Sequence, residues 1–78
     1  MAKERMTLLE RSTLTHPLGC VAHRVVLYYR PGEDYVVWYE HANGKERWTG
    51  NYTRDLGKAW TEFNTRCQRR DVARATFE

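Results

Sequence analysis

The sequence lacks an uninterrupted apolar run of the roughly 18 residues that a membrane-spanning helix needs, so we expect no membrane partner. Its first residues, MAKERMTLLERS, contain neither the apolar segment nor the cleavage site of a secretory signal. Glycine-rich loops that bind phosphates or dinucleotides are also missing. We therefore expect a cytoplasmic, intracellular protein (in the host cytoplasm if a phage encodes it) that uses no cofactor.

Cysteine is scarce, and the two that occur, Cys20 and Cys67, lie far apart in the sequence. In a reducing compartment we expect both to be free thiols. Cys20 lies between His16 and His23, but a nucleophilic cysteine also needs a third, orienting group, and none follows at a recognisable spacing. The same three residues could begin a zinc site, with Cys67 or His41 as the fourth ligand, although the second close pair of ligands that zinc sites normally have is absent. The sequence therefore predicts no enzymatic activity and no required metal.

The aromatic and β-branched residues gather in three stretches that end at turn signals. Each stretch has the composition of a β-strand, PGED separates the first two, and NG separates the second from the third. A helix from about residue 54 to 69 follows, because apolar residues recur there at helical spacing. We predict an α+β fold in which a three-stranded antiparallel meander packs on the C-terminal helix, with room for a short N-terminal helix (αβββα). The expected organisation is an arm or short helix over 1–19, a βββα domain over 20–69 and a basic tail over 70–78.

The Asn43-Gly44 pair predicts a two-residue type I′ turn, which sets the pairing of the second and third strands. Glu40 then faces Arg47, and the two charges are complementary across the strands. One face of the sheet would collect the residues Tyr35, Val37, Tyr39, Trp48 and Tyr52, joined from the first strand by Val25, Leu27 and Tyr29. The helix would cover this face with the stripe Leu56, Ala59, Trp60, Phe63 and Cys67, and Gly50 would leave room for the ring of Trp60.

The opposite face of the sheet is predicted to lack a cover from the helix. It mixes aromatic and basic side chains in a way that suits base stacking with phosphate contact, or the anchor of a protein interface: Arg24, Tyr28, Arg30, Trp38 and Arg47. An exposed Trp38 is unusual in so small a domain. We expect it to be covered by the N-terminal segment (through Met6, Leu8 or Leu9), by a second copy in a homodimer, or by a different partner.

The net charge is +3, and most of the basic excess falls after residue 65. Four arginines recur there at helical spacing and form a predicted basic stripe: Arg66, Arg69, Arg70 and Arg74. Such a stripe could contact phosphate or an acidic protein surface. It could equally be a solvated helix end, where arginine is favourable.

The segment DYVVWYEHANGKERWTGNYTRDLGKAWTEF resembles the arm-type DNA-binding module of phage integrases, with its NGK hairpin and its LGKAW helix rhythm. That resemblance implies a sheet inserted into the major groove, with contacts from Arg24, Arg30, Trp38, Lys45 and Arg47. The small size and aromatic richness also resemble accessory proteins of tailed phages, many of which bind and inhibit a host enzyme. An αβββα order would be similar to double-stranded-RNA-binding domains.

Two functions follow from these patterns. The first is a non-enzymatic binding protein, an accessory factor that binds and modulates a host protein or nucleoprotein complex through the aromatic and basic sheet face. The second is a DNA-binding or RNA-binding module that uses the same face together with the arginine stripe.

Overall fold

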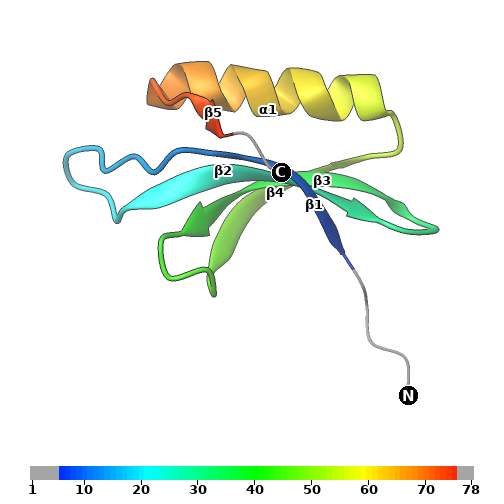
Figure 1. Cartoon of the computed structure of the whole chain (residues 1–78), viewed down its shortest axis with the longest axis horizontal. Coiled ribbons are helices and arrows are strands. Elements are labelled where there is room, and N and C mark those ends of the chain that lie inside the picture. The colour runs from blue at the N-terminus through cyan, green and yellow to red at the C-terminus, as the bar shows by residue number, and fades with distance from the viewer. Residues whose placement is uncertain (1–5, 76–78) are drawn as a thin grey trace.

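The sheet and the single helix of the chain are arranged in two layers (Figure 1). The computed structural model describes residues 6–75. Its elements are β1 (Thr7–Ser12), β2 (His23–Arg30), β3 (Asp34–His41), β4 (Arg47–Thr53), α1 (Leu56–Arg70) and the two-residue β5 (Arg74–Ala75). The strand order is β4-β3-β2-β1-β5, every neighbouring pair is antiparallel, and α1 lies over one face. The predicted α+β class, the meander of β2, β3 and β4 and the C-terminal helix are confirmed. The prediction of three strands is wrong, because β1 and β5 extend the sheet beyond β2 and lie in the segments that were predicted as an arm over 1–19 and a tail over 70–78. Residues 76–78 of that tail lie outside the described residues. No helix within residues 6–75 is long and apolar enough to cross a membrane.

The N-terminal segment is a strand, so the predicted short N-terminal helix, and with it the αβββα order, is wrong. β1 pairs along β2, with Leu8 opposite Tyr28 and Arg11 opposite Val26. Its loose apolar spacing did not fit a helix, whereas as a strand it satisfies backbone groups along an edge of β2 that would otherwise be unpaired. Ser12 ends the strand with a buried hydroxyl that accepts a hydrogen bond from the Val25 amide at 2.9 Å. Residues 1–5 of the predicted arm lie outside the described residues.

The loop between β2 and β3 has the odd length that the prediction required. Arg30 pairs with Asp34, which leaves three residues in the turn. Val25 and Leu27 therefore both point to α1, and neither is exposed to solvent. Tyr29 and Tyr35, which pair across the two strands, are both half-buried, and 5.0 Å separates their ring centroids.

The hairpin between β3 and β4 keeps the predicted pairing of Glu40 with Arg47, but its turn differs from the prediction. Within the turn, Gly44 is the one residue with a positive φ, and its amide donates to the His41 carbonyl at 2.8 Å. The Asn43 side chain accepts from the Lys45 amide at 2.8 Å, so it caps a longer turn over residues 42–45. The predicted type I′ geometry is therefore wrong, because that turn needs a positive φ at both Asn43 and Gly44, and Asn43 does not have one.

A β-bulge in β4 changes the register beyond Trp48. Two residues, Thr49 and Gly50, stand opposite Trp38 alone, so the following pairs are Val37 with Asn51 and Val36 with Tyr52. The predicted position of Tyr52 under the helix is therefore wrong, since a shift of one residue moves a side chain to the other face. Gly50 also makes room for different rings: a Cβ there would lie 2.8 Å from Tyr52 and 3.2 Å from Trp38, not against Trp60.

Thr49 carries strain, because it has a φ of 56° and a β-branched residue rarely adopts that region. We expect Thr49→Gly to stabilise the protein by about 1 kcal/mol, as the strain relieved exceeds the flexibility that glycine adds to the unfolded chain. In a domain of this size that corresponds to a rise of roughly 4–8 °C in melting temperature. Thermal unfolding followed by circular dichroism measures the change in melting temperature. The control is Thr61→Gly at an exposed position of α1, which should lower the melting temperature. A lower melting temperature for Thr49→Gly would contradict the assignment of strain.

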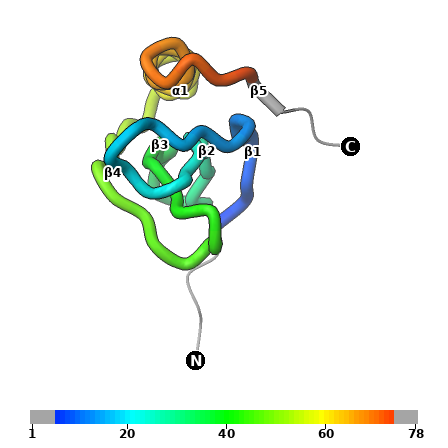
Figure 2. The backbone as a smooth tube through the Cα atoms, turned by 90° about the vertical axis from the view of Figure 1, so that its left-hand side faces the viewer, coloured from blue at the N-terminus to red at the C-terminus, as the bar shows by residue number. Residues whose placement is uncertain are grey.

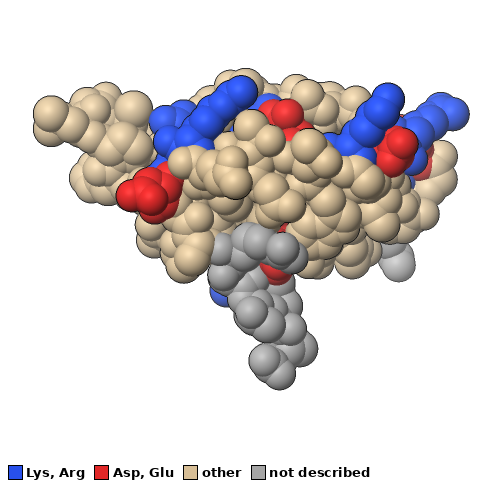
Figure 3. Space-filling view, turned by 90° about the horizontal axis from the view of Figure 1, so that it is seen from above, with Lys and Arg blue, Asp and Glu red and all other residues tan. Residues whose placement is uncertain are grey.

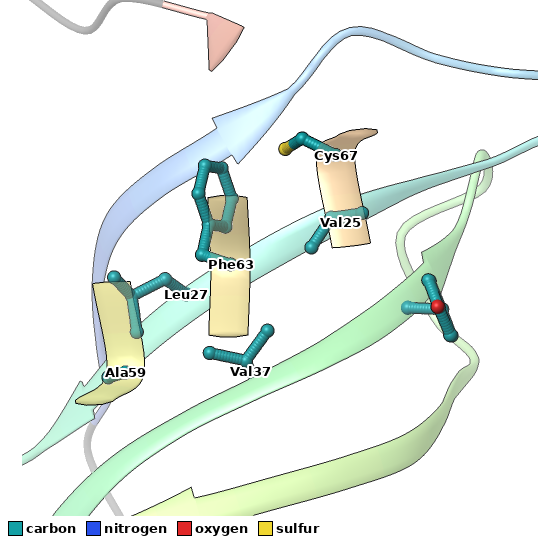
Figure 4. Packing of buried hydrophobic residues seen from close by; sticks show 7 residues of the cluster. Val25, Leu27, Val37, Ala59, Phe63 and Cys67 are labelled. Carbon is teal, nitrogen blue, oxygen red and sulfur yellow. The ribbon is translucent and has the colours of Figure 1, made fainter. Parts of the chain in front are cut away.

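The main core lies between α1 and the sheet and is centred on Phe63 (Figure 4). Phe63 is fully buried, with Ala59 and Cys67 on either side of it along the helix and Val25, Leu27 and Val37 on the strands beneath. Trp60 is only half-buried and packs edge-on against Phe63, with 5.8 Å between centroids. Leu56, predicted at the start of the stripe, is 40% exposed, because it lies in the first turn where α1 rises from the sheet.

The sheet bends away from α1 on both sides (Figures 1 and 2). β1 and β4, which flank the central pair, each contain a bulge, and bulges increase local twist and curvature. We call the face turned away from α1 the outer face.

Candidate binding surface on the outer face

The five residues predicted for the uncovered sheet face all lie on the outer face. Tyr28 and Arg30 come from β2, opposite Val36 and Asp34 of β3. Arg24 and Arg47 lie on either side of Glu40. Trp38 lies on β3, between Val36 and Glu40 along the same face, and pairs with Val26 of β2. The alternation of strand side chains, together with the three-residue turn after Arg30 and the pairing of Glu40 with Arg47, brings these residues to one face.

Three aromatic rings form a continuous row across the outer face. The centroid of Trp38 lies 6.2 Å from that of Tyr28 and 6.0 Å from that of Tyr52, and the second contact is edge-to-face. Tyr52 is 52% exposed, the most open ring of the row. The sequence-based prediction missed Tyr52 on this face, although a glycine inside a strand, here Gly50, is a known signal of a bulge.

Two arginines lie against these rings. The guanidinium of Arg47 is 5.0 Å from the Tyr28 centroid and 5.4 Å from that of Trp38. The guanidinium of Arg30 is 5.0 Å from the Tyr52 centroid. All three contacts are cation–π interactions, which hold the long side chains flat on the surface. We call the set Tyr28, Trp38, Tyr52, Arg30 and Arg47 the aromatic row.

Two carboxylates pair with three arginines of the outer face. Glu40 is 5% exposed and accepts hydrogen bonds from Arg24 at 3.1 Å and from Arg47 at 2.9 Å. Asp34 accepts two from Arg30, at 2.7 and 3.2 Å. Three arginines against these two carboxylates leave a charge of +1 on this set.

The ion pairs are also reflected in two pKa values. The hydrogen bond from Arg30 holds the pKa of Asp34 below its ordinary value, although partial desolvation opposes this effect. For Arg47, partial burial lowers the pKa, but the hydrogen bond with Glu40 and the nearby Tyr28 raise it to a net value above the ordinary one. Both groups therefore stay charged and paired at neutral pH.

Beneath the aromatic row lies a second, smaller core. Val26 and Val36 point to the outer face, yet they are almost completely buried. The neighbouring rings cover them, because Val36 lies between Tyr28 and Tyr52 and Val26 lies beside Trp38. The rings therefore contribute to folding on one side and remain available to solvent on the other.

Trp38 is only half-exposed, and its own neighbours provide part of its cover. Its indole N–H is buried and has no acceptor within residues 6–75. Of the predicted N-terminal covers, Leu8 lies next to Tyr28 at the edge of the sheet and Leu9 packs into the core under α1. The part of the N-terminal segment that the structure describes is therefore an edge strand rather than a lid over Trp38.

Two members of the predicted arginine stripe, Arg66 and Arg70, lie against the sheet, so the four arginines do not form one exposed surface. Arg66 is 4% exposed, donates to Glu62 at 2.6 Å and lies 4.7 Å from the ring of Tyr39. Arg70 lies 4.6 Å from the same ring. Arg69 is exposed, and Arg74 pairs through its backbone with Ser12 in the β5–β1 ladder. The spacing that suggested a stripe instead places two guanidinium groups against Tyr39 at the helix–sheet interface.

The helix side of the molecule carries both signs of charge. In Figure 3, Lys and Arg lie next to Asp and Glu at both ends of this side. It therefore presents no extended positive field of the kind that non-specific nucleic-acid binding requires.

The residues considered for a zinc site or a catalytic thiol are dispersed. Cys67 is buried in the core, Cys20 is exposed in the loop before β2, and His23 is buried against Tyr39 and Trp48. Among residues 6–75, no three His, Cys, Asp or Glu side chains are grouped closely enough to hold a metal ion.

The outer face therefore combines an aromatic row with arginines that carboxylates pair. The resemblance to the integrase module stays a prediction. No family model, curated protein sequence or solved structure that was compared with the chain matches it.

Proposed function

We propose that the chain is a small non-enzymatic binding protein that recognises a host protein, and modulates it, through the aromatic row of the outer face. The observation that carries this proposal is the half-exposed Tyr52 beside Trp38, with Arg30 and Arg47 stacked on the rings. Tyrosine, tryptophan and arginine are the residue types that dominate the binding energy of protein interfaces.

Charge favours a protein partner over nucleic acid. Binding to a phosphate backbone needs cations that are free to replace counterions. Arg24, Arg30 and Arg47 already donate to carboxylates, and Arg66 is buried. A nearly neutral aromatic surface instead suits the desolvated centre of a protein interface, where charged residues are depleted.

The preorganisation of the row supports the same proposal. Cation–π contacts and ion pairs already hold the two long arginines, so less side-chain entropy is lost on association. The buried carboxylate of Glu40 accepts a hydrogen bond from Arg47 and fixes its side chain. Gly50 has no side chain, which leaves space for the rings of Tyr52 and Trp38 to contact each other.

The test uses Tyr52→Ala with Gln68→Ala, an exposed and equally neutral change on the helix, as the matched control. The partner is first captured from host extract with and without nuclease, and the purified pair is then studied by titration calorimetry. We expect Tyr52→Ala to weaken binding about 30-fold or more, equivalent to about 2 kcal/mol. The variant should still unfold cooperatively, with a melting temperature lowered by the lost cover of Val36. Gln68→Ala should bind normally.

Three results would overturn the proposal. Capture that nuclease abolishes, with affinity falling by orders of magnitude between about 50 and 200 mM salt, would establish nucleic-acid binding instead. Normal affinity of Tyr52→Ala would remove the row from the interface. A dimer in sedimentation equilibrium that Tyr52→Ala converts to monomer would show that a second copy occupies the face.

A further inference from the structure

Strand β4 has a sequence pattern that fits a register other than the one it adopts. Its large aromatic residues, Trp48 and Tyr52, stand four positions apart, so regular alternation would place both on the face under α1. In the structure Trp48 keeps that face, but Tyr52 lies on the outer face, because Thr49 and Gly50 together take the place of one residue in the bulge. We call the observed pairing the bulged register, and the pairing without a bulge the regular register.

The bulged register forces Thr49 into a backbone region that disfavours it. Its φ is 56°, and among residues 6–75 the only other non-glycine residue with a positive φ is Asp71, which caps the C-terminus of α1. Thr49 caps no helix, and its branched side chain makes this region costly. In the regular register Thr49 would stand opposite Trp38 as an ordinary strand residue, a setting that favours threonine. The strain therefore raises the free energy of the bulged register alone.

The face under α1 has room for Tyr52 near the start of the helix. The bulged register places Asn51 on this face, opposite the buried Val37, and Asn51 is exposed. Leu56, in the first turn of α1, is 40% exposed, and Trp60 is only half-buried. Because β4 leads directly into α1, a Tyr52 ring turned to this face would cover apolar surface that the bulged register leaves in solvent.

Contacts on the outer face oppose these two effects. The Tyr52 ring lies edge-to-face with Trp38, with 6.0 Å between centroids, and the Arg30 guanidinium lies 5.0 Å from it. Each contact contributes modestly, and Tyr52 remains 52% exposed. Strain and lost burial on one side, and ring contacts on the other, therefore bring the two registers close in free energy, which is the condition for a two-state element.

The register can change while α1 and the other strands stay in place. The pair of Tyr39 with Trp48 precedes the bulge and is common to both registers. Beyond the bulge, the regular register would bring Tyr52 rather than Thr53 opposite Tyr35, which adds one residue to the connection between β4 and α1. β4 also ends the strand order of the sheet, so no further strand has to change its pairing.

We propose that β4 is a register switch. In the bulged register Tyr52 completes the aromatic row, and in the regular register Tyr52 packs under α1 and the row is incomplete. The bulged register is the major state, and we expect the regular register at a population of about 1–10%. The effect on binding rests on the proposed function, because a partner that contacts Tyr52 would hold the bulged register. The exchange itself is a property of the free protein.

Relaxation-dispersion NMR of the isotope-labelled free protein tests the switch. We expect microsecond-to-millisecond exchange at the amides of residues 49–53, and none in β1 on the other side of the sheet. Thr49→Gly relieves the strain and should lower the population of the regular register about fivefold or more. Thr61→Gly, the same change at an exposed position of α1, should leave the exchange as it is.

Gly50→Ala should shift the equilibrium in the other direction. In the bulged register the new Cβ would lie 2.8 Å from the Tyr52 ring and 3.2 Å from the Trp38 ring, whereas in the regular register it would turn to the face under α1. Cross-strand nuclear Overhauser effects read the register directly, because Tyr52 pairs with Val36 in the bulged register and with Tyr35 in the regular one. We expect the contact of Tyr52 with Tyr35 to appear in Gly50→Ala.

Three results would overturn the switch. The first is flat dispersion profiles at residues 49–53 of the unmodified protein. The second is exchange that Thr49→Gly leaves unchanged, which would place its origin elsewhere. The third is a folded Gly50→Ala protein that keeps the contact of Tyr52 with Val36, because the ring would then have moved aside without a change of register.

The comparison of Thr49→Gly with the unmodified protein decides the matter if Gly50→Ala does not fold. Every measurement is made on the free protein. A failed switch is therefore distinguished from a failed binding surface, which the titrations with Tyr52→Ala test separately.

Discussion

Phe63→Ala should remove most of the stability of the domain. Phe63 is fully buried at the centre of the main core, and truncating a buried phenylalanine costs about 3–5 kcal/mol through lost transfer energy and the cavity left behind. A domain this small has a total stability near the lower end of the usual 5–15 kcal/mol. Urea denaturation monitored by tryptophan fluorescence should show a midpoint shifted close to zero denaturant.

Trp60→Ala is the informative control for Phe63→Ala. Trp60 is half-buried at the border of the same core and contacts Phe63 edge-on. Its truncation should destabilise by less than that of Phe63, although it removes the larger side chain. A greater loss for Trp60→Ala would show that the centre of the core lies nearer the start of α1 than the structure has it.

Glu40→Gln should be the most disruptive single change on the outer face. The Glu40 carboxylate is nearly inaccessible and bridges Arg24 and Arg47, so its loss leaves two partly buried guanidinium groups without an anion. Removing one member of a largely buried ion pair costs several kcal/mol, and we expect about 3 kcal/mol here because both arginines keep some solvent contact. Denaturant unfolding measures the cost.

Glu33→Gln is the matched control for Glu40→Gln. Glu33 lies in the turn after β2, its side chain is mostly exposed, and it reaches Arg30 only at 3.6 Å. An exposed pair of this kind contributes at most about 1 kcal/mol, so the change should be almost silent. Equal effects of the two substitutions would show that Glu40 does not brace the aromatic row.

Local patterns in the sequence were sufficient for the elements that local rules control. The alternation of β2 and β3 predicts which side chains reach the core and which reach the outer face, and the three-residue turn after Arg30 preserves that alternation. The helical spacing of Ala59, Phe63 and Cys67 predicts the buried side of α1. In both cases each side chain's direction follows from the period of its own element.

Strand β1 could not be predicted in the same way. Its six residues, TLLERS, have no clear period, and a bulge interrupts their pairing with β2. Their conformation is decided by the free edge of β2, which offers backbone partners that the segment cannot find alone. The same is true of Arg66 and Arg70, whose spacing on α1 suggests a basic stripe until Tyr39 is seen to lie beneath them.

The candidate binding surface shows the same division. The sequence predicted that Arg24, Tyr28, Arg30, Trp38 and Arg47 share one face, from strand periodicity combined with the two turns that set the register. Tyr52 joined them only through the bulge at Thr49 and Gly50, where a strained backbone is held in place by pairing on both sides of it. The exposure of Leu18 was likewise decided by the tertiary structure, in which backbone hydrogen bonds to Ala73 and from Ala42 fix the two ends of the loop that carries it. Side-chain direction within one regular element is a local property, whereas bulges, edge pairing and exposure depend on which distant backbone is available to bond and to cover.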